Sequence, residues 1–253
     1  MESPLSTLAP SLDSGRPAEL PVQTSRKKRI LKLMGRIALG LAVLLFVAHL
    51  AWGAWGSNEW KLVRDVDGAK LWTLKTPGEH LLRVKASVTV KSSLAGMVKL
   101  LEDLDSCVDA YCYDTWRIQQ IPSQPGRAAT YVRFKFDIPG LKTREYVAFA
   151  EHYQDPATRQ LDINVIAAPS GMPRDTCCVR VTHLHNHWKL TPLPGGKVAI
   201  EFAQDTDLGG MPYPLANIAL AEGTFKLMGD LQGLMDKPRY RDAKVPDIQE
   251  LGS

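Results

Sequence analysis

Three histidines stand at alternate positions of one segment, His183, His185 and His187. On a β-strand, alternate side chains share one face and lie about 7 Å apart, so two of these imidazoles could bind one metal ion. A catalytic zinc ion also needs a third protein ligand and an open position, and packing would have to supply Cys177 or His152. The pattern would support metal-assisted hydrolysis only with such a third ligand.

Apolar residues occupy the opposite positions of the same segment: Leu184, Trp188 and Leu190. Because an amphipathic strand buries its apolar face, we expect the histidines to point into water and to hold no metal. The sequence carries no nucleophile elbow, phosphate loop, HExxH helix or paired-carboxylate signature. Absence of these motifs does not exclude an enzyme. A metal-assisted hydrolase on this strand therefore stays an alternative to a non-enzymatic protein without a cofactor.

Arg144 and Glu145 are adjacent charges in an apolar segment. Neighbours on a strand point to opposite faces, so these two side chains cannot pair with each other inside one cavity. A buried Arg144 would need a carboxylate or a carbonyl partner. We interpret Arg144 first as a residue that holds the fold together and second as a ligand contact.

The cysteines fall into two groups, Cys107 with Cys112 and Cys177 with Cys178. Cys107 and Cys112 could form a disulfide across one turn, or one of them could reach Cys177 or Cys178. Small buried thiols are the other interpretation.

Residues 37–55 are nineteen consecutive positions without a formal charge. As a helix they would span roughly 28 Å, close to the hydrocarbon thickness of a bilayer. The basic run Arg26-Lys27-Lys28-Arg29 precedes them, so the positive-inside rule predicts a cytoplasmic N-terminus and an exported C-terminal part, periplasmic or otherwise extracytoplasmic. We predict a single-pass transmembrane signal anchor, and export would place the cysteines in an oxidising compartment.

Two other interpretations of this segment stay open. A cleaved signal peptide would use Ala51-Trp52-Gly53 as its cleavage site, although the 36 residues before the apolar run are long for such a peptide. A buried helix of a soluble domain would normally have a polar face, whereas His49 is the only titratable side chain in the run.

The charge is unevenly distributed along the chain. Residues 1–36 hold seven of the 31 basic and three of the 27 acidic residues, which leaves 24 of each after them. A balanced domain does not favour nucleic acid as a partner, and membrane headgroups account for the basic tail. We predict a disordered basic cytoplasmic tail at 1–36, the anchor at 37–55, one folded domain at 57–236 and a polar C-terminal tail at 237–253.

The folded domain is predicted to run from strands through a helix and more strands to a long final helix. Asp67-Gly68 predicts a hairpin between strands at 60–64 and 70–73, followed by a strand at 81–90. Ser92 or Ser93 would cap the first helix. Breakers separate the remaining strands, which should pair antiparallel, and the last helix covers 214–235. These later strands are expected at 117–121, 130–136, 143–153, 161–168, 179–190 and 198–205.

These elements predict an α+β fold in which a curved antiparallel sheet surrounds the C-terminal helix. Several strands present bulky apolar side chains at alternate positions: Val132, Phe134 and Phe136; Leu161, Ile163 and Val165; Ile200 and Phe202. Such residues could fill a solid core or line a hollow one, and both interpretations stay open at this point.

Four motifs occur in a familiar order across the predicted domain. They are Trp60-Lys61-Leu62 with Asp67-Gly68-Ala69-Lys70-Leu71-Trp72, Thr143-Arg144-Glu145-Tyr146-Val147, Ser170-Gly171-Met172-Pro173 with Cys178-Val179-Arg180-Val181, and Asp207-Leu208-Gly209-Gly210-Met211-Pro212 with Leu215-Ala216-Asn217. Together they resemble START domains, the steroidogenic acute regulatory protein-related lipid transfer family.

The resemblance implies a helix-grip fold with a tunnel for one lipid or sterol, and the predicted anchor would hold that domain beside a membrane. Its function would be non-enzymatic lipid binding, extended to lipid transfer, with the loop at Gly209-Gly210-Met211 and the final helix as a movable lid. A cyclase-like helix-grip enzyme and a protein-binding scaffold with a filled core are the alternatives. The residues expected to line the cavity are Phe134, Arg144, Tyr146, Ala148, Ile163, Val165, Met172, Trp188, Phe202, Ile218 and Phe225.

The sequence departs from the family pattern at two places. The family's tryptophan–aspartate pair after the first helix has no clear counterpart. Steroid-binding members can carry a buried basic residue near Ala150, so the alanine argues against a polar ligand contact from that position.

Overall fold

The computed structural model describes residues 24–252 and divides after Leu50 into two units. Helix α1 (Thr24–Ala54) begins before the predicted anchor, so the basic run from Arg26 is helical rather than part of a disordered tail. Within the described part of the chain, α1 is the helix whose length and composition would let it cross a membrane. The side chains from Arg26 to Leu50 are exposed, unlike those of a buried core helix, and the tail predicted at 1–23 lies outside the described residues.

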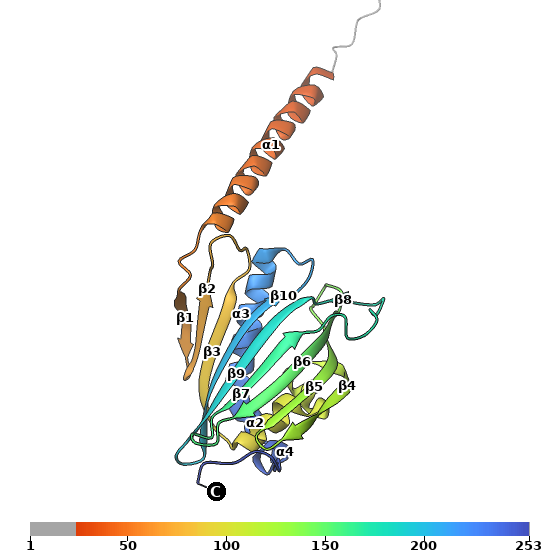
Figure 1. Ribbon diagram of the computed structural model, residues 1–253. Coiled ribbons are helices and arrows are strands. Elements are labelled where there is room, and N and C mark those ends of the chain that lie inside the picture. Colours follow the sequence, from red (N-terminus) through yellow and green to blue (C-terminus); the bar gives the residue numbers. More distant parts are fainter. Residues whose placement is uncertain (1–23, 253) are drawn as a thin grey trace, which may run out of the picture. The chain divides into compact units, whose positions relative to one another are not determined.

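The second unit is built on a ten-stranded sheet (Figure 1). Its main path runs β1-β2-β3-β10-β9-β7-β6-β5-β4, with antiparallel pairing at every step. The bounds are β1 (Trp60–Val66), β2 (Ala69–Leu74), β3 (Arg83–Lys91), β4 (Tyr113–Gln124), β5 (Arg127–Phe136), β6 (Arg144–Gln154), β7 (Leu161–Ala167), β8 (Val179–Arg180), β9 (His183–Leu193) and β10 (Lys197–Asp207). The predicted antiparallel sheet is therefore confirmed, including the first hairpin.

One predicted strand is divided in two. The segment expected at 179–190 forms β8 and β9, and β8 adds to β6 in parallel. The division follows from burial: the Arg180 side chain turns into a buried ion pair with Glu145, and Val181 packs into a separate apolar cluster. Neither contact is visible in the alternation of residues along the segment.

The helices lie together on one side of the sheet (Figure 1). They are α2 (Leu94–Glu102), a 3-10 turn η1 (Leu104–Ala110), α3 (Tyr213–Met235) and α4 (Pro238–Arg241). Ser93 caps α2 as predicted, because its Oγ accepts the Gly96 N–H at 3.0 Å. The long C-terminal helix α3 is also confirmed, and its buried side chains join the main core against the sheet.

The segment after α3 does not leave the domain as the predicted polar tail. Tyr240 of α4 is completely buried and Ile248 nearly so. The Glu250 carboxylate accepts the N–H groups of Leu94 and Ala95 at 3.0 and 2.9 Å, at the start of α2. The folded domain therefore extends to the last described residues.

Candidate ligand cavity

A cavity of about 740 Å³ lies between the sheet and α3. Strands β4, β5, β6, β7, β9 and β10 form one wall, and α3, the end of α2 and the η1 loop form the other. This volume falls within the range of pockets that hold one small organic ligand. Residues of two apolar clusters line the cavity, the main core and a second cluster around Val132, Tyr146 and Leu184. The interior is hollow rather than solidly packed.

Aromatic side chains make up much of the sheet wall. Tyr146 stacks on Phe134 with ring centres 5.0 Å apart, and Trp188 stacks on Phe202 at 4.1 Å. Phe136 meets the edge of Tyr146. Burial raises the pKa of Tyr146, which keeps its hydroxyl protonated. Such a surface suits the apolar body of a ligand.

No family model matches the sequence. An uncharacterised protein of Pseudomonas aeruginosa is 24% identical over 203 residues, which cover 78% of this chain and 98% of that protein. A crystal structure of a STAR-related lipid transfer protein fragment from Xanthomonas axonopodis superposes with a TM-score of 0.60 at 20% identity, covering 70% of this chain and 99% of that one. Human StAR-related lipid transfer protein 5 also gives 0.60, at 16% identity, with coverage of 79% and 96%.

This chain has the START fold. The likeness extends over nearly the whole of both solved domains, so the helix-grip arrangement predicted from the motifs is confirmed.

Six of the eleven predicted cavity residues line the hollow between the sheet and α3, which we call the START cavity. All lie on the sheet wall: Phe134, Tyr146, Ile163, Val165, Trp188 and Phe202. Their assignment came from strand alternation, which correctly gave the face of each strand that points inward.

The other five predicted residues lie elsewhere, and two of these are on α3. The side of α3 that faces the cavity carries Leu220, Thr224 and Leu227, which recur at helical spacing. Ile218 is 61% exposed, and Phe225 lies under the Arg64 guanidinium, 4.6 Å from its ring centre. Because α3 carries apolar residues on most sides, the sequence pattern did not show which side faces inward.

Two more of these five predicted residues lie on or near the sheet. Ala148 packs into the second apolar cluster rather than against the hollow. Met172 lies in the loop before β8, where its carbonyl accepts a hydrogen bond from Arg180 at 3.1 Å. Neither side chain contributes to the lining.

Arg144 positions the loop that leads into α3. Its Nε donates to the carbonyl of Leu208 at 2.7 Å and its Nη2 to that of Gly209 at 3.1 Å, while Nη1 donates to Lys142. Carbonyl partners were one of the two possibilities predicted for a buried arginine here. At Gly209, φ is +68°, and a Cβ would lie 2.8 Å from Val179, so the loop needs glycine at this point.

Glu145 points to the opposite face of β6, where it is buried between two arginines. Its oxygens accept from Arg133 and Arg180, each at 2.8 Å. Burial alone would raise the pKa of Glu145, but the two arginine hydrogen bonds hold it below its ordinary value. This network joins β5, β6 and β8 and lies outside the START cavity.

Polar groups that the motifs did not reveal also line the cavity. His152, two positions beyond Ala150 on β6, pairs with Glu102 at the end of α2, with 2.6 Å between Nδ1 and Oε1. Asn186, Gln204 and Thr206 add further polar atoms from β9 and β10. Tyr146, Ala150 and His152 stand at alternate positions of the strand predicted at 143–153, so this signal was present in the sequence.

Hydrogen bonds among Tyr111, Lys226 and Asp230 join the η1 loop to α3 at the cavity mouth, and we call this group the latch. Lys226 Nζ donates to the Tyr111 hydroxyl at 2.7 Å and to Asp230 at 2.6 Å, and Tyr111 donates to Asp230. Beside it, a disulfide joins Cys107 to Cys112, and both line the cavity. The pairing across one turn is therefore the one found, and Cys177 pairs with Cys178.

The three histidines lie on the outer face of β9, as expected. His183 pairs with Asp205 and His187 with Asp162, each at 3.0 Å. Within residues 24–252, the group close enough to hold a metal ion is instead Asp175 with Cys177 and Cys178, and the disulfide there occupies both sulfurs. That group of three potential ligands, found among the described residues, contains none of the three histidines.

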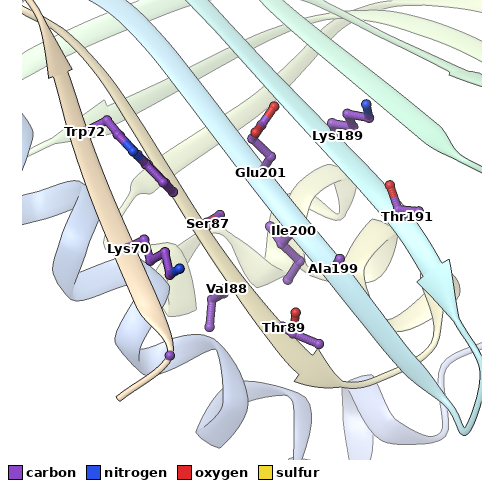
Figure 2. A pocket seen from close by; sticks show the side chains of 11 residues that line it. Lys70, Trp72, Ser87, Val88, Thr89, Lys189, Thr191, Ala199, Ile200 and Glu201 are labelled. Atoms are coloured by element: carbon purple, nitrogen blue, oxygen red, sulfur yellow. The ribbon is translucent and has the colours of Figure 1, made fainter. Parts of the chain in front are cut away.

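A second hollow lies on the outer face of the sheet, across β2, β3, β10 and β9 (Figure 2). Its floor includes a row of paired residues, Lys70, Ser87, Glu201 and Lys189. It is open, and the charges in this row alternate in sign. Polar and apolar side chains share its lining.

Proposed function

We propose that this protein binds one lipid or sterol in its START cavity, beside a membrane to which α1 anchors it, and exchanges that ligand with the membrane. The observation that carries the proposal is the hollow itself: about 740 Å³, walled by aromatic and aliphatic side chains. The solved START structures of similar shape carry names that describe lipid transfer, which supports the same class of ligand here.

Energetics favour a non-enzymatic carrier. Each methylene kept from water is worth about 0.8 kcal/mol, so an acyl chain of about sixteen carbons faces a barrier on the order of 10 kcal/mol on leaving a bilayer. A cavity lined by Phe134, Trp188 and Phe202 replaces one apolar environment with another. Net transfer then costs little while the barrier falls, and no bond needs to be made or broken.

The proposed topology places the apolar part of α1 that ends at Leu50 across the membrane and the START domain on the exported side. The basic residues at the start of α1 support this orientation. The two disulfides support an oxidising compartment. We place the lipid-binding domain from residue 51 to residue 252, since the segment after α3 packs into it.

Contacts of Trp52 support an anchor that is retained. Its indole N–H donates to the carbonyl of His80 at 2.9 Å, and its ring stacks on Tyr213 at 6.0 Å. Cleavage after Gly53 would remove Trp52 from the domain. Both contacts would then be lost.

Photo-crosslinking of the full chain in vesicles tests the proposal. A long-chain lipid probe bearing a diazirine should label peptides from β5, β6 and β9 in the wild type. Ala150→Trp fills the cavity from β6 and should abolish that labelling. Tyr153→Trp lies on the opposite face of the same strand, is half exposed, and should leave it intact. Labelling confined to α1 would contradict the proposal.

A further inference from the structure

Three buried polar atoms on the cavity wall lack hydrogen-bond partners within the described chain. They are His152 Nε2, Asn186 Oδ1 and Thr206 Oγ1. His152 and Thr206 are 5% and 2% exposed. Leaving a buried polar atom unpaired costs free energy, and native proteins pair nearly all of them. Their common position on the wall of one hollow points to a ligand that supplies the missing partners.

The His152–Glu102 pair fixes the proton on one imidazole nitrogen. A carboxylate accepts hydrogen bonds but donates none, so Nδ1, 2.6 Å from Glu102 Oε1, carries the proton. In the tautomer with its proton on Nδ1, the other nitrogen, Nε2, holds a lone pair that accepts a hydrogen bond. A donor on the ligand would satisfy this atom.

The other two atoms extend the same preference across the wall. Asn186 Oδ1 is an acceptor, and Thr206 Oγ1 can accept or donate. Ile163 of β7 pairs with His152 of β6, and Val165 of β7 pairs with Asn186 of β9. Asn186 therefore lies two strands away from His152 and is displaced by one inward-facing position along the strand direction. The wall thus offers acceptors at separated points between apolar side chains.

We propose that the cavity selects an uncharged lipid bearing a hydroxyl or similar donor, which donates to His152 Nε2. This inference rests on the proposed lipid-binding function and names the class of ligand. An anionic head, such as a phosphate or a carboxylate, would lie beside the Glu102 carboxylate in a poorly hydrated site. Of the cationic residues in the lining, Arg117 is exposed and Lys226 is engaged by Asp230 at the mouth.

Three photo-crosslinking probes on the full chain in phosphatidylcholine vesicles test this selection. They share one diazirine- and alkyne-bearing alkyl chain and end in a hydroxyl, a methyl ether or a carboxylate. The alcohol should label peptides of β6 and β9 about five- to tenfold more than the ether, as one buried hydrogen bond implies. The carboxylate should label them less than the alcohol.

Variants of β6 assign the preference to one atom. His152→Leu removes the acceptor and should make the alcohol and the ether equal, while His152→Gln restores an acceptor and should recover part of the difference. Tyr153→Phe, on the opposite face, should behave as the wild type, and thermal unfolding verifies that each variant is folded.

The outcomes separate this inference from the proposed function. Equal labelling by alcohol and ether in the wild type, or stronger labelling by the carboxylate, would overturn the inference while lipid binding stands. Absence of labelling in the cavity by all three probes would overturn both.

Discussion

Arg144 and Glu145 show which features of a single residue the sequence predicts and which it does not. Strand alternation correctly predicted that the two side chains diverge, and burial chemistry predicted a carbonyl or carboxylate partner for the arginine. The partners themselves come from distant segments, Leu208 and Gly209 for Arg144, and Arg133 and Arg180 for Glu145. Such pairings depend on sheet order, which local sequence does not contain.

Replacing Glu145 by Gln should destabilise the domain by about 3 kcal/mol or more. The variant leaves two buried arginines without their shared carboxylate, and an unpaired buried charge is expensive. Urea or thermal unfolding of the full chain in detergent measures the change. Glu201→Gln, an exposed site on β10, is the matched control and should change stability little. A loss no larger than that of the control would contradict this account.

Acid should weaken the same network. The pKa of Glu145 is held below its ordinary value of 4.5 in the folded state, so the folded protein binds its proton less readily than the unfolded chain. The stabilisation is complete above that ordinary value and is lost as pH falls through the lower folded pKa. Hydrogen bonds from Lys135 lower the pKa values of Asp114 and Asp175, so these two groups should act in the same direction. Unfolding free energy measured from neutral pH downward should fall less steeply in Glu145→Gln.

At the scale of elements, periodicity and turn residues located the strands, the two main helices and the Ser93 cap. They did not locate α4 or the packing of the final segment, because residues after Asp236 are mostly polar and only Tyr240 and Ile248 are buried there. They also did not separate β8 from β9, where Arg180 and Val181 turn inward. Short elements fixed by tertiary contacts leave little periodic signal.

The latch between the η1 loop and α3 should control how fast the ligand exchanges. Asp230 receives hydrogen bonds from Tyr111 and Lys226, and these lower the pKa of its carboxyl group. Asp230→Asn should speed release of a fluorescent lipid several-fold while stability changes little, since exposed ion pairs contribute weakly. Stopped-flow transfer to acceptor vesicles measures the rate. Asp236→Asn, at the end of α3, should match the wild type, and an unchanged rate for Asp230→Asn would exclude a gating role.

At the scale of the whole molecule, the sequence predicted the sheet, the long helix and the apolar face of several strands. It did not distinguish a hollow from a filled core, because alternation gives the direction of a side chain and not its distance from the facing wall. Resemblance to START domains supplied that expectation. His152 was within reach of strand alternation, whereas its partner Glu102 comes from α2 and only tertiary structure brings the two together.

The junction at the start of the domain should be sensitive to small changes. A Cβ at Gly56 would lie 2.5 Å from the carbonyl oxygen of Lys75, and φ there is +149°. The Lys75 ammonium group, whose pKa burial lowers, donates to the carbonyl of Trp55 at 2.9 Å. Gly56→Ala should therefore lower the melting temperature of the full chain by several degrees. Gly229→Ala, with open space around its Cβ in α3, should be neutral or stabilising.

Helix α2 connects the C-terminal segment of the described chain with the ligand site. Glu250 holds the N–H groups at the beginning of α2, and Glu102 at its far end orients His152. A protein shortened at Asp236 would retain every residue of the cavity wall. It would lose the Glu250 carboxylate that binds the start of α2. We expect such a fragment to bind an alcohol and its methyl ether almost equally. Chain length beyond the final long helix thus bears on ligand choice as well as on folding.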